Sequence, residues 1–181
     1  MIEDRQNDFA QSFFVAPISR YVIILGKILG ESLVSFTQIF GLILIGWLAG
    51  VPLDFWAVLR LVPVLFFICL FGGAFGVIIM ANFMDKRSID QVFPFLIFPQ
   101  FFLSGVFIPM KDVPLYLLIL SRLTPLFYAV DLIRGIYFWG KPEYSKVVIY
   151  SPFLNFFVIL VLFIIFLVLG TYIFVKSEKE R

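Results

Sequence analysis

Long, continuously apolar runs dominate this chain, and short polar stretches separate them. A bilayer core needs about 20 mostly apolar residues per helix. Four segments meet that requirement: 28–50, 57–81, 92–108 and 153–175. The third is short and contains Pro94 and Pro99, so we expect it to be bent or to begin late. Because apolar and polar positions do not alternate, the pattern predicts an all-α, polytopic membrane helix bundle with four transmembrane helices in one transmembrane domain.

Composition agrees with a membrane protein and excludes several functions. The chain is 62% hydrophobic and 14% charged, whereas soluble domains are about half apolar and a quarter charged. It contains no histidine and one cysteine, Cys69, so the commonest general base and the usual metal ligands are missing. Its acids are scattered near the ends of the runs, which argues against a membrane enzyme and against a metal site. The small net charge of +2 does not suggest nucleic acid.

Basic residues in short flanking segments predict the orientation of the bundle. If the four spans alternate, both termini lie on one side together with most of the nearby bases. These bases are Arg5, Arg20, Lys27, Lys86, Arg87, Lys176, Lys179 and Arg181. The short loop 51–56 on the other side has Asp54 and no base, although the long segment 109–152 carries five. We therefore expect both termini to be cytoplasmic, in the plasma membrane (the inner membrane of a bacterium or archaeon).

Polar residues inside the apolar runs are costly and need a reason. Glu31, Ser35 and Gln38 are spaced at i, i+4 and i+7, which places them on one stripe of the first helix. Gln100 and Ser104 are similarly spaced in the third run. Hydrogen bonding between helices explains both groups, and so does lining of a translocation path. All five are candidates for such a path.

The segment 1–27 precedes the first predicted span and contains a short amphipathic piece. Phe9, Phe13 and Phe14 form an apolar face on an otherwise polar stretch, and Pro17 ends it. Such a helix ordinarily lies in the membrane interface.

The segment 109–152 contains two helix-like pieces that are too short or too polar to cross a bilayer as full spans. Thr124 is a suitable N-cap, with Pro125 at the first helical position. Asp131 and Arg134, at i and i+3, are placed to pair on one face. We interpret this pair as a structural clamp and not as a binding site. The segment fits either a re-entrant helix pair or a plain extramembrane cap.

Two motifs resemble those of ABC-2 type transporter permeases, the membrane subunits of one class of ATP-driven exporters. The first, F-L-S-G-x-F-x-P, begins at Phe102 and is followed by x-P-L-x-Y-A-V-D-x-x-R, which ends at Arg134. The second lies in the amino-terminal segment, where the usual Gly-Thr is replaced by Asn7-Asp8. Its matching residues are Asp4, Arg5, Phe13, Pro17, Ser19, Arg20, Gly26 and Lys27.

The resemblance implies a role for each end of the chain. Segment 1–27 becomes a coupling helix that docks on an ATP-binding-cassette ATPase subunit through Phe9, Phe13 and Phe14, with Pro17 and Arg20 at the junction. Segment 109–152 becomes a re-entrant element beside the exit. The expected partners are that ATPase, a second permease copy in a homodimer or heterodimer, and membrane lipid. ATP and Mg²⁺ would bind the partner, with no cofactor on this chain, since it has no G-x-x-x-x-G-K-[ST] loop.

Family permeases have six spans, so the resemblance also implies that about two spans are missing before residue 1. The expected substrate is a lipid, a drug or a lipid-linked glycan, moved outward. A non-transporting structural or assembly protein remains the alternative. A carrier driven by an ion gradient would favour a carboxylate near the middle of a span, and the predicted spans have none.

Overall fold

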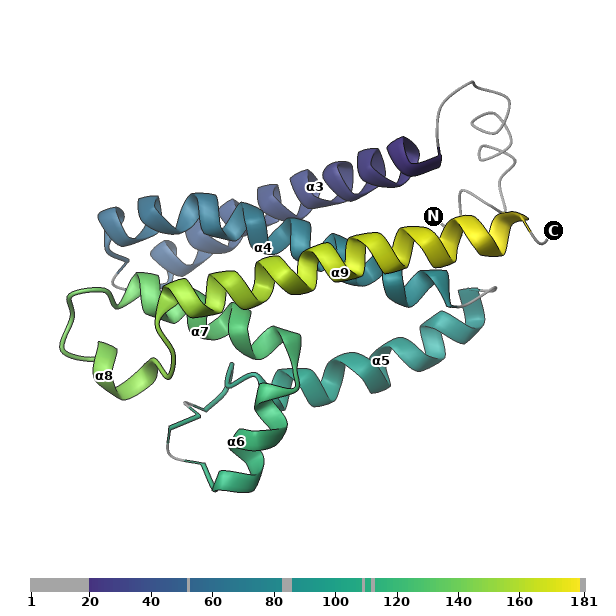
Figure 1. The fold of residues 1–181 in the computed structure, drawn as a ribbon. Coiled ribbons are helices and arrows are strands. Elements are labelled where there is room, and N and C mark those ends of the chain that lie inside the picture. The colour runs from purple at the N-terminus through teal and green to yellow at the C-terminus, as the bar shows by residue number, and fades with distance from the viewer. Residues whose placement is uncertain (1–19, 52, 83–85, 109, 112, 180–181) are drawn as a thin grey trace.

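Every element that the structure describes is a helix. The computed structural model describes residues 20–51, 53–82, 86–108, 110–111 and 113–179. Its helices, labelled in Figure 1, are α3 (Arg20–Leu48), α4 (Phe55–Ala81), α5 (Lys86–Leu103), α6 (Leu115–Arg122), α7 (Pro125–Tyr137), α8 (Tyr144–Val147) and α9 (Pro152–Lys179). The predicted all-α fold is confirmed for this part of the chain.

Three of these helices are long and apolar enough to cross a membrane: Tyr21–Leu48, Phe55–Ala81 and Pro152–Ile173. The apolar part of α5, Gln91–Leu103, is shorter and spans about 20 Å at the usual helical rise, less than a hydrocarbon core of about 30 Å. Helices α6 and α7 bend by 99° where they meet and would add a fourth span if they were counted as one. The predicted polytopic membrane bundle therefore has three to four candidate spans.

The third apolar run does not form the helix 92–108 that its composition predicts. Helix α5 includes both Pro94 and Pro99 but ends at Leu103, and the chain then turns through residues 104–108. Gly105 allows this turn because its φ of +82° lies in the left-handed region, which only glycine adopts without cost. An added Cβ would also lie 2.9 Å from Met110 Cγ. Hydropathy does not register this backbone requirement.

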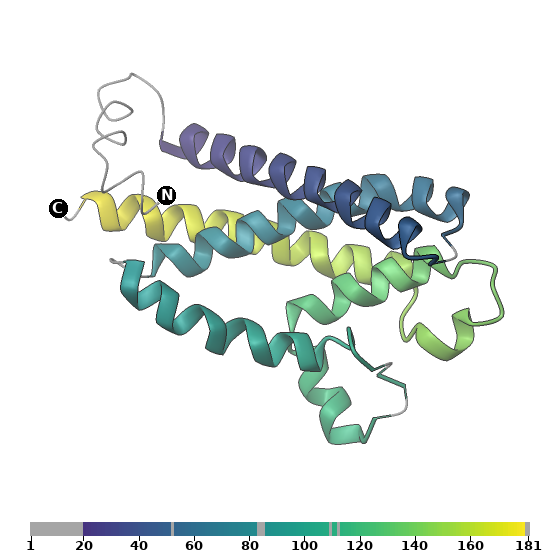
Figure 2. The same cartoon turned by 180° about the vertical axis from the view of Figure 1, so that it is seen from behind.

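Helices α4 and α9 form the centre of the bundle. In both views they lie between α3 on one side and α5 on the other (Figures 1 and 2). The start of α3 and the end of α9 lie at one end, which we call the terminal end. Helix α8 and the loop between α3 and α4 lie at the opposite end, which we call the loop end. Helix α7 packs on both α4 and α9 close to the loop end.

Two apolar clusters hold the central helices together. Phe71, Ala129, Leu132 and Ile159 join α4, α7 and α9, and Ile24, Ile28 and Val77 join α3 to α4. The rings of Phe67 and Phe156 lie 4.9 Å apart across α4 and α9. Close packing of this kind holds membrane helices together, because moving an apolar side chain out of lipid yields little hydrophobic free energy.

Small residues set the closest approaches between helices. A Cβ added at Gly170 of α9 would lie 3.0 Å from the backbone nitrogen and 3.1 Å from the Cα of Ile78 in α4. Between α3 and α4, buried Ser32 donates its hydroxyl to the Ile28 carbonyl (2.6 Å) and approaches the Cys69 carbonyl of α4 (3.2 Å). At both contacts a small residue lets the two helix backbones lie close together, as is usual in membrane helix pairs.

We predict that Gly170→Ala destabilises the bundle by about 1–3 kcal/mol, since the new methyl meets backbone atoms of Ile78 that have no room to move. Gly72→Ala is the matched control, because a Cβ there meets no atom within 4 Å beyond its chain neighbours and the backbone of its own helix. Equilibrium unfolding in mixed micelles with increasing SDS measures both variants. Equal effects of the two substitutions would contradict the close α4–α9 contact.

Candidate functional site

The motif-bearing segment after α5 folds into the bent pair of α6 and α7. Helix α7 begins at Pro125, as predicted, with Thr124 at the N-cap position. The Thr124 hydroxyl does not cap the helix as expected. It donates instead to the Ser121 carbonyl (2.7 Å), at the end of α6, and therefore fixes the bend between the two helices.

Asp131 joins α7 to the start of α9. Its carboxylate is 3% exposed and accepts three hydrogen bonds, from the backbone N–H of Ile149 (2.9 Å), the backbone N–H of Tyr150 (2.8 Å) and the side-chain amide of Asn155 (2.8 Å). The two backbone groups belong to the non-helical stretch between α8 and α9, where no helical carbonyl is available to them. Three donors compensate for the burial of a charged group that would otherwise be strongly disfavoured.

Asn155 completes this anchor from the first turn of α9. It is fully buried, and its side-chain nitrogen faces Asp131 because a carboxylate only accepts. The same nitrogen lies 3.5 Å from the Tyr150 carbonyl. Its Oδ1 has no hydrogen-bond partner among the described residues. The orientation of the amide is therefore set by the acceptors of its nitrogen, the Asp131 carboxylate at 2.8 Å and the more distant Tyr150 carbonyl.

Arg134 lies one turn after Asp131 but bonds to a different part of the chain. Its guanidinium donates to the carbonyl of Gly105, in the turn that follows α5. No ion pair joins Asp131 and Arg134 in the part of the chain that the structure describes, so the direct pairing expected from their spacing is not observed. Each residue instead holds α7 to another element: Asp131 to α9 and Arg134 to the end of α5.

Charged and aromatic groups gather at the loop end. Lys141 pairs with Asp54 at 3.6 Å, joining the α7–α8 loop to the loop before α4. Its ammonium also lies 4.4 Å from the centre of the Tyr137 ring. Lys111 donates to the carbonyl of Ser145 in α8. These contacts tie together three connecting segments at this end of the bundle.

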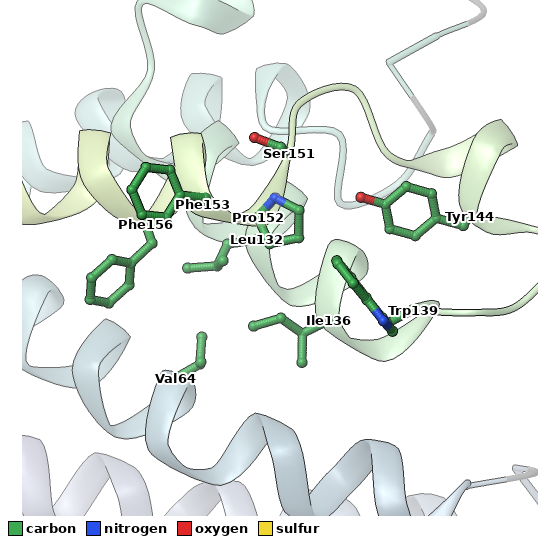
Figure 3. A pocket seen from close by; sticks show the side chains of 9 residues that line it. All are labelled: Val64, Leu132, Ile136, Trp139, Tyr144, Ser151, Pro152, Phe153 and Phe156. Carbon is green, nitrogen blue, oxygen red and sulfur yellow. The ribbon is translucent and has the colours of Figure 1, made fainter.

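A cavity of about 490 Å³ lies beneath these loops, between α4, α7 and α9. Apolar side chains form nearly all of its wall (Figure 3). Trp139 and Tyr144 stand at one end of it, and Val64 and Phe156 at the other. The lining residues are Val64, Leu132, Ile136, Trp139, Tyr144, Ser151, Pro152, Phe153 and Phe156.

The structure separates the five candidates for a translocation path. Glu31, Ser35 and Gln38 are exposed on α3; Glu31 pairs with Lys27 at 3.8 Å, and the Ser35 hydroxyl donates to the Glu31 carbonyl (2.9 Å). Gln100 and Ser104 belong to the α5 side, and both bond to backbone carbonyls of α5 itself. Since α4 and α9 lie between α3 and α5 (Figure 2), the two groups do not face one another within one chain.

The predicted coupling residues Phe9, Phe13, Phe14 and Pro17 lie outside the described residues. Arg20 begins α3, and its side chain is also outside what the structure describes. Residues 1–19 of the predicted coupling segment therefore stay a sequence-based prediction. Residues 20–27 form the first turns of α3, so the first long helix begins earlier than the predicted span 28–50.

The structure is that of a multi-pass helical membrane protein, and comparison with known proteins gives its family. The family model described as ABC-2 type transporter matches residues 1–138. The chain belongs to the ABC-2 type transporter family. It is also 28% identical over 184 residues to a protein of Cyanophora paradoxa named "Putative transport permease ycf38", a match that covers 99% of this chain and 63% of the relative. No solved structure matches the chain.

Two residues that organise the structure were not singled out in the sequence. Asn155 lies in a long apolar run where a buried amide is unexpected, and Ser32 is next to the polar stripe but on the packed face of α3. An isolated polar residue inside an apolar run was the available signal for Asn155. For Ser32, only the position of α4 distinguishes it from its neighbours.

We predict that Asp131→Asn costs about 3 kcal/mol of folding free energy, because the uncharged amide accepts more weakly and turns its NH₂ toward one of three N–H donors. Asp54→Asn is the control. It retains an acceptor for the Trp56 N–H at the α4 cap and removes an ion pair that is partly exposed, so the loss should stay below about 1 kcal/mol. SDS unfolding of both variants provides the measurement. A loss for Asp131→Asn no larger than the control's would contradict the anchor.

Proposed function

We propose that this chain is the permease subunit of an ABC exporter, which moves a lipid, a drug or a lipid-linked glycan outward with energy from ATP hydrolysed by a partner subunit. The main support is membership of the ABC-2 type transporter family, together with the similarity to a relative named as a transport permease. The chain spans 63% of that relative, so the activity of the whole protein is part of the proposal.

The structural observation that best supports this proposal is the way the motif-bearing segment after α5 folds. It forms a sharply bent helix pair whose second helix is held to α9 by Asp131 and to the end of α5 by Arg134. A bent helix pair that is anchored to two neighbouring elements is suited to move with them as one body. In the proposed exporter the α6–α7 pair is the re-entrant element beside the exit, and movement of α5 or α9 displaces it.

The exposed polar face of α3 and the exposed apolar face of α5 support a path shared between chains. Glu31, Ser35 and Gln38 are exposed on α3, and α3 lies on the side of α4 and α9 away from α5 (Figure 2). Several large apolar side chains of α5 are also exposed, including Phe95 at 81% and Phe98 at 63%. Faces of this kind suit contact with further helices in the membrane. In the proposal, a second permease copy and the ATPase subunits complete the transporter, and the path runs where the copies meet.

The amino-terminal segment is the proposed connection to the ATPase. Phe9, Phe13 and Phe14 would dock on the partner, with Pro17 and Arg20 joining that segment to α3. ATP-driven closure of the two ATPase subunits would then be passed through α3 to the rest of the bundle. No nucleotide is expected to bind this chain.

We predict that this chain co-purifies with its ATPase subunit in nanodiscs and that Phe13→Asp with Phe14→Asp abolishes the complex. The added charges would have to be buried in an apolar groove of the partner, at high cost. A Gln11→Asp, Ser12→Asp variant adds the same charge to the same segment and should retain binding. Pull-down with and without ATP gives the readout.

Failure of the wild-type chain and of a form extended by an upstream two-span segment to bind any ATPase would refute the transporter proposal. It would leave a non-transporting structural or assembly protein as the function. Equal loss of binding in both charge variants would refute the docking role of the phenylalanines alone.

We predict that both termini are cytoplasmic and that α8 faces outward. In a Cys69→Ala background, Ser145→Cys, in an exposed loop-end position, should react with a membrane-impermeant maleimide in intact cells. Lys176→Cys, exposed at the terminal end, should react only after permeabilisation. The opposite labelling pattern would reverse the predicted orientation.

A further inference from the structure

The loop-end cavity has a gradient of polarity along its length. At one end stand Trp139 and Tyr144 (Figure 3). Their ring planes are at 85° to each other, and the ring centres lie 6.1 Å apart. Both side chains have an apolar body and one polar group, as is typical at the membrane–water interface. At the other end stand Val64 and Phe156, which offer no polar atom. Any molecule that fills the cavity therefore has a polar end near the loops and an apolar end toward the bundle centre.

The cavity also extends in the direction of membrane depth. Asp54, next to the start of α4, pairs with Lys141 in the loop that follows α7, so the beginning of α4 lies level with the loops. Val64 lies about 14 Å further along α4 at the usual helical rise. An occupant thus passes from the level of the loops to well inside the depth that hydrocarbon chains occupy.

Charge at the polar end favours an acidic head group. Among the described residues, Lys111 bonds to α8, Lys141 lies in the loop before it and Lys146 belongs to it, against the acids Asp54 and Glu143. Asp54 and Lys141 compensate each other, which leaves Lys111 and Lys146 against Glu143. Lys146 is exposed, two residues after Tyr144, which lines the cavity. Lysines near a membrane surface attract acidic lipids by about 1 kcal/mol each.

We propose that this cavity is a binding site for an acidic phospholipid, with one acyl chain between Val64, Ile136 and Phe156 and the phosphate at the lysines around α8. A cavity of about 490 Å³ is within the range of small-molecule sites. Phe153, which is 81% exposed, and Trp139, which is 59% exposed, leave its mouth open. The site depends on the loop-end fold only and is independent of the proposed transport activity.

Photo-crosslinking of the full chain in nanodiscs tests this site. The probe is phosphatidylglycerol with a diazirine at the end of one acyl chain, present as a minor component in phosphatidylcholine. The adducts should concentrate on the peptides that contain Val64 and Phe156. Val64→Phe fills the deep end of the cavity and should remove these adducts, and Ile136→Phe serves as an independent second variant. Val168→Phe, at an exposed position further along α9, is the matched control and should leave them unchanged.

The head-group part of the site is measured by competition. Unlabelled phosphatidylglycerol should displace the probe, phosphatidylcholine should compete more weakly, and Lys146→Gln should reduce the preference for phosphatidylglycerol about fivefold. SDS unfolding shows which variants fold normally, and only those are compared.

Three outcomes would overturn the proposal. The first is an even spread of adducts along α9, and the second is their persistence in both correctly folded filling variants. The third is equal competition by the two lipids.

Discussion

The carboxylate of Asp131 satisfies a constraint on which the whole loop end depends. Between α7 and α9 the chain must reverse direction, and the non-helical residues before α9 have backbone N–H groups without helical partners. Asp131 accepts two of these, from Ile149 and Tyr150, and a third hydrogen bond from Asn155 in the first turn of α9. Buried backbone donors left without acceptors are costly in a medium with little water. The anchor therefore fixes where α9 begins and how it lies against α7.

Other features of the loop end follow from that fixed geometry. With α9 held against α7, Pro152 and Phe156 stand opposite Ile136 and Val64, and the cavity forms between them. Arg134, one turn later on α7, reaches the Gly105 carbonyl and connects the end of α5 to the same unit. One short helix thus holds two others, α9 and α5, through two charged side chains. The two side chains bond to different elements and not to each other.

The centre and the sides of the bundle differ in how complete they are. Helices α4, α7 and α9 bury a shared apolar core, whereas α3 presents an exposed polar stripe and α5 presents exposed phenylalanines. In a membrane, exposed apolar side chains are compatible with lipid, but a polar stripe on a lipid-facing helix is unfavourable. This contrast is the physical basis for proposing that further helices pack on α3 in the assembled protein.

The sequence by itself determined the class of fold, because long apolar runs without alternation have only one stable form in lipid, the helix. It also located the start of α7, where proline at the first helical position is a local signal, and the motif that indicates the family. It did not determine where α5 ends, because that depends on the left-handed Gly105 and not on hydropathy. The sequence also did not determine the partners of Asp131 and Arg134. Their spacing along α7 suggested a direct pair. Asp131 instead accepts from the residues just before α9 and from Asn155, and Arg134 donates to the turn after α5. Only the tertiary structure decided these contacts, since a buried charge bonds to whichever groups the folded chain brings within reach.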